Sequence, residues 1–263
     1  MAPQRSRSTR RIRPVHGVTI VVVALAGLAI WLIASPRIAD APPDPPPGAD
    51  APTDTRTDPI PEAQDTTPRI AFLGDSLTVG VGAPQERGFA WQTAELLDWP
   101  LAVVDGVSGS GYVAPGLGSP MPDRAGNVID AEPDVVVVAG GNNDIFQGVG
   151  AEQVEPAADQ LFTDLREGLP DATLVVVGPF PTSLAGLETT DPVLDAVRRV
   201  SADADAHFVD PRDLLAGPLA ELETWDPYIS PDGLHPNEGG YQLIAEALAG
   251  ALPELTTNEL TTR

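Results

Sequence analysis

The hydrophobic positions of this chain follow a repeating order after residue 69. Short, continuously apolar runs alternate with longer segments in which apolar residues recur at helical spacing. The apolar runs, which predict buried strands, are Ile70–Leu73, Leu101–Val104, Val135–Ala139, Leu174–Val177 and Phe208–Val209. The helical patterns are Ala90–Leu97, Ala151–Leu169, Pro192–Ala204 and Gly240–Leu252. Such strands separated by helices predict an α/β fold, in which helices cover both faces of a parallel sheet.

A different apolar pattern lies near the N-terminus, where Gly17–Ala34 carries no charge. At about 1.5 Å per residue, this run nearly crosses a hydrocarbon core of about 30 Å. A buried core helix would have a polar edge, which the run lacks, and the apolar part of a signal peptide is usually about 7–15 residues long. We therefore expect a transmembrane signal anchor over residues 17–35, with cleavage and secretion as the alternative. The arginines of residues 1–16 predict a cytoplasmic tail and place the rest of the chain outside the membrane.

Residues 36–68 are rich in Pro, Asp, Thr and Ala. This composition is typical of an extended, disordered linker, because it offers too little apolar surface to bury a core. The folded domain is therefore predicted to span residues 69–253, with a C-terminal tail over residues 254–263.

Charge and composition narrow the classes of partner. The formal net charge is -23, which argues against nucleic acid as a partner. The absence of cysteine excludes disulfides and thiolate metal sites. No carboxylate or histidine spacing indicates a metal, and no G-x-G-x-x-G loop indicates a nucleotide. We expect neither a metal nor a cofactor, and the oligomeric state stays open.

A serine follows the first predicted strand. Ser76 comes just past Ile70–Leu73, at the strand end where parallel α/β sheets place their ligands. A serine hydroxyl becomes a good nucleophile when a base, best a histidine oriented by a carboxylate, takes its proton. His235 lies on a polar, Pro-bounded loop three residues after Asp232, whereas His207 begins a predicted strand. Each feature alone is as readily structural, but together they predict a nucleophile, a base and an orienting carboxylate.

The tetrahedral intermediate of acyl transfer also needs hydrogen-bond donors. The backbone N–H groups of Ser76 and Gly109 and the side-chain amide of Asn143 could supply them. The alternatives are a turn or helix cap for Asn142 and Asn143, and mere flexibility for the glycine loop. Gly111 competes with Gly109 for the same role. All these loops follow strand ends, so we expect them to meet at one edge of the sheet.

Four short blocks resemble those of the SGNH/GDSL hydrolases, a family of serine esterases and lipases. The blocks are Gly74-Asp75-Ser76-Leu77, Val107-Ser108-Gly109, Gly141-Asn142-Asn143-Asp144 and Asp232-Gly233-Leu234-His235. The resemblance implies a flavodoxin-like three-layer α/β/α sandwich and a carboxylic ester hydrolase. It implies that Ser76 is the nucleophile, His235 the base and Asp232 its orienter. It also implies an oxyanion hole formed by Ser76, Gly109 and Asn143.

Other activities stay open beside this one. An α/β-hydrolase is disfavoured because Ser76 lacks the G-x-S-x-G elbow. An O-acyltransferase with the same triad and a non-catalytic tethered binding module are the remaining alternatives. The acyl length and the alcohol part of the ester are not fixed, but an anchored, outward-facing enzyme would meet cell-envelope glycans and lipids. The predicted cleft walls are Tyr112–Asp123, Pro179–Leu187 and Trp225–Tyr228.

Overall fold

The computed structural model describes residues 67–181, 191–219 and 224–260, all within one compact unit of the chain. The centre of these residues is a five-stranded parallel sheet in the order β2-β1-β3-β4-β5. The strands are β1 (Ile70–Gly74), β2 (Leu101–Gly106), β3 (Val135–Ala139), β4 (Thr173–Val177) and β5 (His207–Val209). The predicted strands are confirmed, and their order is that of a flavodoxin-like sheet.

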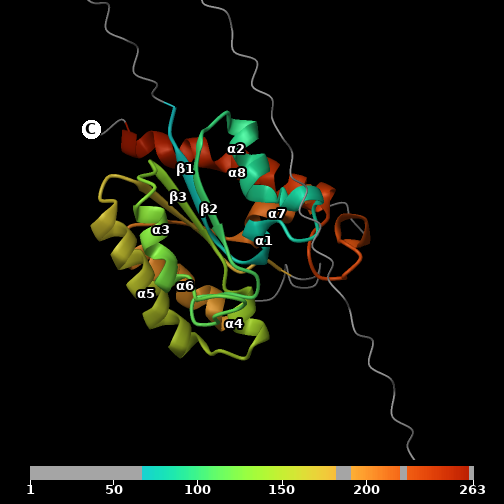
Figure 1. Cartoon of the computed structure of the whole chain (residues 1–263), viewed down its shortest axis with the longest axis horizontal. Coiled ribbons are helices and arrows are strands. Elements are labelled where there is room, and N and C mark those ends of the chain that lie inside the picture. Colours follow the sequence, from blue (N-terminus) through green and yellow to red (C-terminus); the bar gives the residue numbers. More distant parts are fainter. Residues whose placement is uncertain (1–66, 182–190, 220–223, 261–263) are drawn as a thin grey trace, which may run out of the picture. The chain divides into compact units, whose positions relative to one another are not determined.

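Helices cover both faces of the sheet (Figure 1). The α-helices of the described residues are α1 (Ser76–Val79), α2 (Phe89–Leu97), α3 (Ala125–Ile129), α4 (Asn142–Phe146), α5 (Ala151–Gly168), α6 (Pro192–Asp203), α7 (Pro211–Leu219) and α8 (Glu238–Leu260). Short 3₁₀ turns are η1 (Pro84–Glu86), η2 (Pro122–Arg124) and η4 (Asp226–Tyr228). Helices α2 and α8 pack on one face, and α3, α5 and α6 pack on the other. The predicted three-layer sandwich is therefore confirmed.

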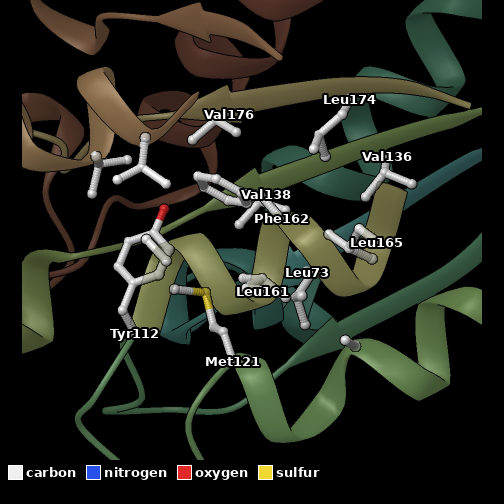
Figure 2. Packing of buried hydrophobic residues seen from close by; sticks show 14 of the residues in the cluster. Leu73, Tyr112, Met121, Val136, Val138, Leu161, Phe162, Leu165, Leu174 and Val176 are labelled. Atoms are coloured by element: carbon white, nitrogen blue, oxygen red, sulfur yellow. The ribbon is translucent and has the colours of Figure 1, made fainter. Parts of the chain in front are cut away.

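Strand residues alternate between the two layers. Leu73 of β1 packs toward α3, α5 and α6, whereas its neighbour Phe72 packs toward α2 and α8. Figure 2 shows the first of these layers, where Leu161 and Leu165 of α5 lie against the strand side chains. Because both faces are covered, every residue of β1, β3 and β4 is buried, which explains their continuous apolar runs.

The short helices were not predicted from the sequence. Helices α1, α3 and α4 have only four or five residues, which is too few to show a helical period. Helix α7 contains Gly217 and Pro218, which interrupt its pattern. Helix α8 continues past its expected end at Leu252, and both Leu252 and Thr256, about one turn apart, are buried. Part of the predicted C-terminal tail is therefore helical.

No helix within the described residues is long and apolar enough to cross a bilayer. The predicted anchor, Gly17–Ala34, lies outside those residues, and so does the predicted linker up to residue 66. Both stay predictions.

Candidate active site

Ser76 is positioned by the end of β1. The side chain of Asp75 caps α1 by accepting a hydrogen bond from the amide of Leu77 (2.9 Å), and Ser76 is the first residue of that helix. A Cβ at Gly74 would lie 2.2 Å from Thr78 Oγ1, so only glycine allows the chain to turn this closely. Ser76 consequently lies at the carboxyl edge of the sheet, where it is 6% exposed and lines a cavity.

A hydrogen-bonded series runs from Ser76 through His235 to Asp232. Ser76 Oγ lies 2.9 Å from His235 Nε2, and His235 Nδ1 lies 2.7 Å from Asp232 Oδ2. The two loops that carry these residues are 159 residues apart in the chain. They meet because the segment between η4 and α8 returns to the carboxyl edge of the sheet. The structure thus brings together the three residues predicted as nucleophile, base and orienter.

Asp232 is surrounded by donors from its own loop. Its Oδ1 accepts the N–H groups of Leu234 and His235, each at 2.9 Å, and the hydroxyl of Ser230 at 2.7 Å. The hydrogen bond from the His235 side chain, followed by these backbone bonds, holds the pKa of Asp232 well below its usual range. Asp232 is therefore ionised at neutral pH.

The backbone N–H groups of Ser76 and Gly109 are among those beside the cavity that donate to no partner within the described residues. Gly109 has a φ of +79°, which favours glycine at this position. The amide of Gly111 instead donates to the carbonyl of Ala114 (2.8 Å), and Gly111 does not line the cavity. Of the two glycines that the sequence left open, the geometry favours Gly109.

Asn142 and Asn143 are adjacent in α4 but have different partners. Asn143 Nδ2 donates to the carbonyl of Ser110 (2.9 Å) and, over a longer distance of 3.3 Å, to Asp75 Oδ2. Asn142 Nδ2 donates to the carbonyl of Phe180 (2.7 Å), whose amide donates back to Asn142 Oδ1 (2.8 Å). The Asn143 amide therefore lies between the nucleophile loop and the glycine loop, whereas Asn142 joins α4 to the chain after β4.

The glycine loop is held from behind by Asp144, to which sequence reasoning gave no role. This buried carboxylate accepts the amides of Tyr112 (2.8 Å), Val113 and Ala114 (2.9 Å each). A Cβ at Gly111 would lie 2.1 Å from the same carboxylate, so the loop requires glycine here. The family block that contains Asp144 was the signal that could have identified it.

A second residue that sequence reasoning missed, Arg124, connects the end of β1, next to Ser76, to the segment that contains Gly109 and Ser110. Its buried guanidinium pairs with Asp105 and donates to the carbonyl of Gly74 and the hydroxyl of Ser110, each at 2.9 Å. Gly74 ends β1 just before the nucleophile, and Ser110 carries the carbonyl that binds Asn143. No local signal marks Arg124, because these two partners lie 50 and 14 residues away.

Asp75 is a second carboxylate beside Ser76, and it is buried. Desolvation raises its pKa to about 6, against the opposing effects of the Leu77 amide and of the charges of His235 and Arg124. The neighbouring carboxylate of Asp144 adds to the rise. Asp75 therefore changes its charge within a pH range close to neutral.

A cavity of about 310 Å³ opens at Ser76. Much of its lining is apolar and includes Phe146, Phe180, Leu215, Trp225, Ile229 and Ile244. His207 lies in β5 and does not line it. Among the residues that the structure describes, no group of three His, Cys, Asp or Glu side chains is arranged to hold a metal ion.

The predicted cleft walls are only partly correct. Phe180 and Trp225 come from two of the predicted segments, and residues 182–187 lie outside the described part of the chain. The segment Tyr112–Asp123 contributes nothing to the lining. Its first residue, Tyr112, is buried in the core, where its ring meets that of Phe162 edge-on at 6.1 Å (Figure 2).

A flavodoxin-like α/β/α sandwich with a serine and a histidine in hydrogen-bond contact at its carboxyl edge is typical of a serine hydrolase. Residues 72–243 match the GDSL-like Lipase/Acylhydrolase family. The chain belongs to that family and is a carboxylic ester hydrolase.

Among curated proteins, the chain is similar to GDSL lipase Rv0518 of Mycobacterium tuberculosis. The two are 29% identical over 198 residues, which cover 68% of this chain and 79% of the relative.

Similar solved structures include the psychrotrophic esterase EstA from Pseudoalteromonas sp., with a TM-score of 0.55 and 18% identity, covering 71% of this chain and 97% of EstA. The family 3 carbohydrate esterase of Clostridium thermocellum has a TM-score of 0.54 and 22% identity, covering 73% of this chain and 98% of the esterase. The acetylxylan esterase Axe2 of Geobacillus stearothermophilus has a TM-score of 0.53 and 20% identity, covering 72% of this chain and 94% of Axe2. At these identities the similarity concerns the fold alone.

Proposed function

We propose that this chain is an extracytoplasmic serine ester hydrolase that works through an acyl-enzyme on Ser76. The observation that carries the proposal is the hydrogen-bonded series of Ser76, His235 and Asp232. His235 Nε2 takes the proton of the Ser76 hydroxyl as its oxygen attacks the ester carbonyl, and the Asp232 carboxylate stabilises the imidazolium that forms. The imidazolium then protonates the leaving alcohol, and a water activated by His235 hydrolyses the acyl-enzyme.

The oxyanion of the tetrahedral intermediate is stabilised by three donors. The unpartnered amides of Ser76 and Gly109 supply two of them. Asn143 supplies the third by exchanging its 3.3 Å hydrogen bond to Asp75 for one to the oxyanion, while its 2.9 Å bond to Ser110 keeps the amide in place. Such donors act mainly in the transition state, because the charge develops on the carbonyl oxygen only as Ser76 attacks.

The substrates that we propose are acyl or acetyl esters of cell-envelope lipids or glycans. The relative from M. tuberculosis is named a lipase, and two of the similar structures are carbohydrate and acetylxylan esterases. The apolar lining of the cavity accommodates the hydrocarbon part of an ester.

Labelling with a fluorescent phosphonate probe, together with hydrolysis of nitrophenyl acetate, tests the chemistry. Ser76→Ala should abolish both labelling and hydrolysis, and His235→Ala should nearly abolish hydrolysis, because triad members act as a unit. Ser108→Ala is the matched control: Ser108 also lines the cavity but makes no hydrogen bond to a histidine. Persistent labelling and turnover in Ser76→Ala would overturn the assignment of the nucleophile.

The location is part of the same proposal and rests on the sequence pattern of Gly17–Ala34. Protease added to intact cells should release a soluble, active domain by cutting within residues 36–66. Cleavage only after the cells are lysed would refute the extracytoplasmic location.

A further inference from the structure

Large apolar side chains stand exposed beside the mouth of the Ser76 cavity. Phe146 of α4 is 54% exposed and Leu234, next to His235, is 50% exposed, and both line the cavity. Leu117, which lies between β2 and η2 and follows Gly116, is 90% exposed. Single exposed apolar residues are common on proteins, but here three of the five large ones within the described residues belong to segments that border one cavity.

Contacts through Gly109 connect Leu117 to the mouth of the cavity. Leu117 follows Gly116, whose Cα would lie 3.2 Å from a Cβ on Gly109, and Gly109 lines the cavity. On its other side, the carbonyl of Gly109 accepts a hydrogen bond from Gln147 (3.1 Å), which directly follows Phe146. The segment that carries Leu117 and the end of α4 thus both contact Gly109. The first presents Leu117 to solvent and the second presents Phe146.

The position of Leu117 is fixed by the backbone. Its amide donates to the carbonyl of Ser108 (2.9 Å), and the amide of Gly118 donates to the carbonyl of Pro115 (3.2 Å). Gly116 has a φ of +58°, and a Cβ there would lie 2.3 Å from the amide nitrogen of Ser110. The exposed leucine is therefore held outward by a bonded turn, and little entropy is lost when it inserts into a partner.

The charges around the mouth indicate the chemistry of that partner. Residues 106–122 contain no charged residue, although the chain as a whole carries a formal net charge of -23. An anionic surface would be repelled by such a chain, and a cationic one has no carboxylates to meet within residues 106–122. An uncharged, water-insoluble ester phase fits both the apolar side chains and the uncharged segment that carries Leu117.

We propose that Leu117, Phe146 and Leu234 form an apolar rim that docks the enzyme onto the surface of an uncharged lipid ester. This inference rests on the proposed function, because it is the apolar cavity behind the rim that receives the ester drawn from that surface. The rim narrows the proposed substrates, from acyl or acetyl esters of lipids or glycans to uncharged lipid esters in an aggregated phase.

The test compares one ester in solution with one at an interface, using the full chain so that the N-terminal segment is the same in every variant. Nitrophenyl acetate is the soluble substrate and emulsified tributyrin is the uncharged ester surface. Leu117 carries the test because it does not line the cavity. Leu117→Asp should leave hydrolysis of nitrophenyl acetate unchanged and lower hydrolysis of the emulsion roughly tenfold or more, since a charge replaces an apolar contact with the lipid.

Leu96→Asp is the matched control, because Leu96 lies on α2, does not line the cavity, is 54% exposed and changes the net charge equally. It should leave both rates unchanged. If the two variants affect hydrolysis of the emulsion equally, or if neither does, the proposed docking by the rim is wrong. It is also wrong if the unmodified enzyme is a dimer that Leu117→Asp dissociates, because the partner of the rim would then be a second copy of the chain. If the unmodified enzyme fails on nitrophenyl acetate as well, the proposed function itself is wrong.

Discussion

Asn143→Ala and Asn142→Ala should affect different properties, kcat in the first and stability in the second, although the two residues are neighbours in α4. Asn143→Ala removes a proposed oxyanion donor, which typically costs about 2.7–4 kcal/mol in the transition state, or roughly 10²–10³ in kcat. Its hydrogen bond to the Ser110 carbonyl contributes only about 1 kcal/mol to the free energy of unfolding. We therefore expect a large loss of kcat, little change in KM and nearly unchanged stability.

Asn142→Ala removes two short hydrogen bonds and leaves the buried amide and carbonyl of Phe180 without partners. Each such group costs about 1–3 kcal/mol, so the free energy of unfolding should fall by about 2–6 kcal/mol. The kcat of the enzyme that remains folded should change far less than in Asn143→Ala.

Urea unfolding and steady-state kinetics with a soluble nitrophenyl ester separate the two effects, because one reports stability and the other reports kcat and KM. Two results would refute the reasoning. One is an equal loss of kcat at both positions, and the other is a loss in Asn143→Ala that is confined to KM.

Three further predictions concern the residues around the nucleophile. Burial raises the pKa of Asp75 to about 6, so the folded chain keeps a proton that the unfolded chain releases near pH 3.8, and stability falls as pH rises through this window. Urea unfolding at several pH values should show this fall, and Asp75→Asn should flatten it; an unchanged slope would contradict the burial argument. Arg124→Lys should lower kcat because a single ammonium group cannot replace the several donors of the guanidinium. The control Arg166→Lys loses hydrogen bonds to carbonyls away from the cavity and should lower only stability. Equal losses of kcat in the two variants would show that Arg124 does not position the site. Gly111→Ala should destabilise the fold by about 1–3 kcal/mol because its Cβ has no room, whereas a Cβ at Gly126 meets nothing within 4 Å and Gly126→Ala should not destabilise it. Thermal unfolding measures both, and equal changes in Tm would contradict the prediction.

Most of the sheet could be predicted because its strands are buried on both faces. A strand such as Val135–Ala139 is then apolar at every position, and this pattern does not depend on which helices pack on it. Helices α1 and α4 could not be predicted, because each is stabilised mainly by the loops that it connects and is too short for a periodic pattern.

The candidate site divides in the same way. Ser76, Asp232 and His235 stand in short motifs, and in the structure the three side chains form one hydrogen-bonded series. Asn142 and Arg124 act through partners that lie 38 and up to 50 residues away, and no local spacing reveals such contacts. Their roles follow from tertiary packing, which single-sequence patterns do not contain.

The separation of 159 residues between Ser76 and His235 has a consequence for folding during synthesis. Because a chain is synthesised from its N-terminus, Ser76 is made long before His235. Closing so long a loop is costly in entropy until other contacts compensate. Docking of α8 supplies them, since Tyr241 donates to the carbonyl of Val81 (2.7 Å) and α8 packs on α2. A nascent chain therefore exposes Ser76 before His235 can contact it, and under the proposed mechanism ester hydrolysis begins only after the two residues have met.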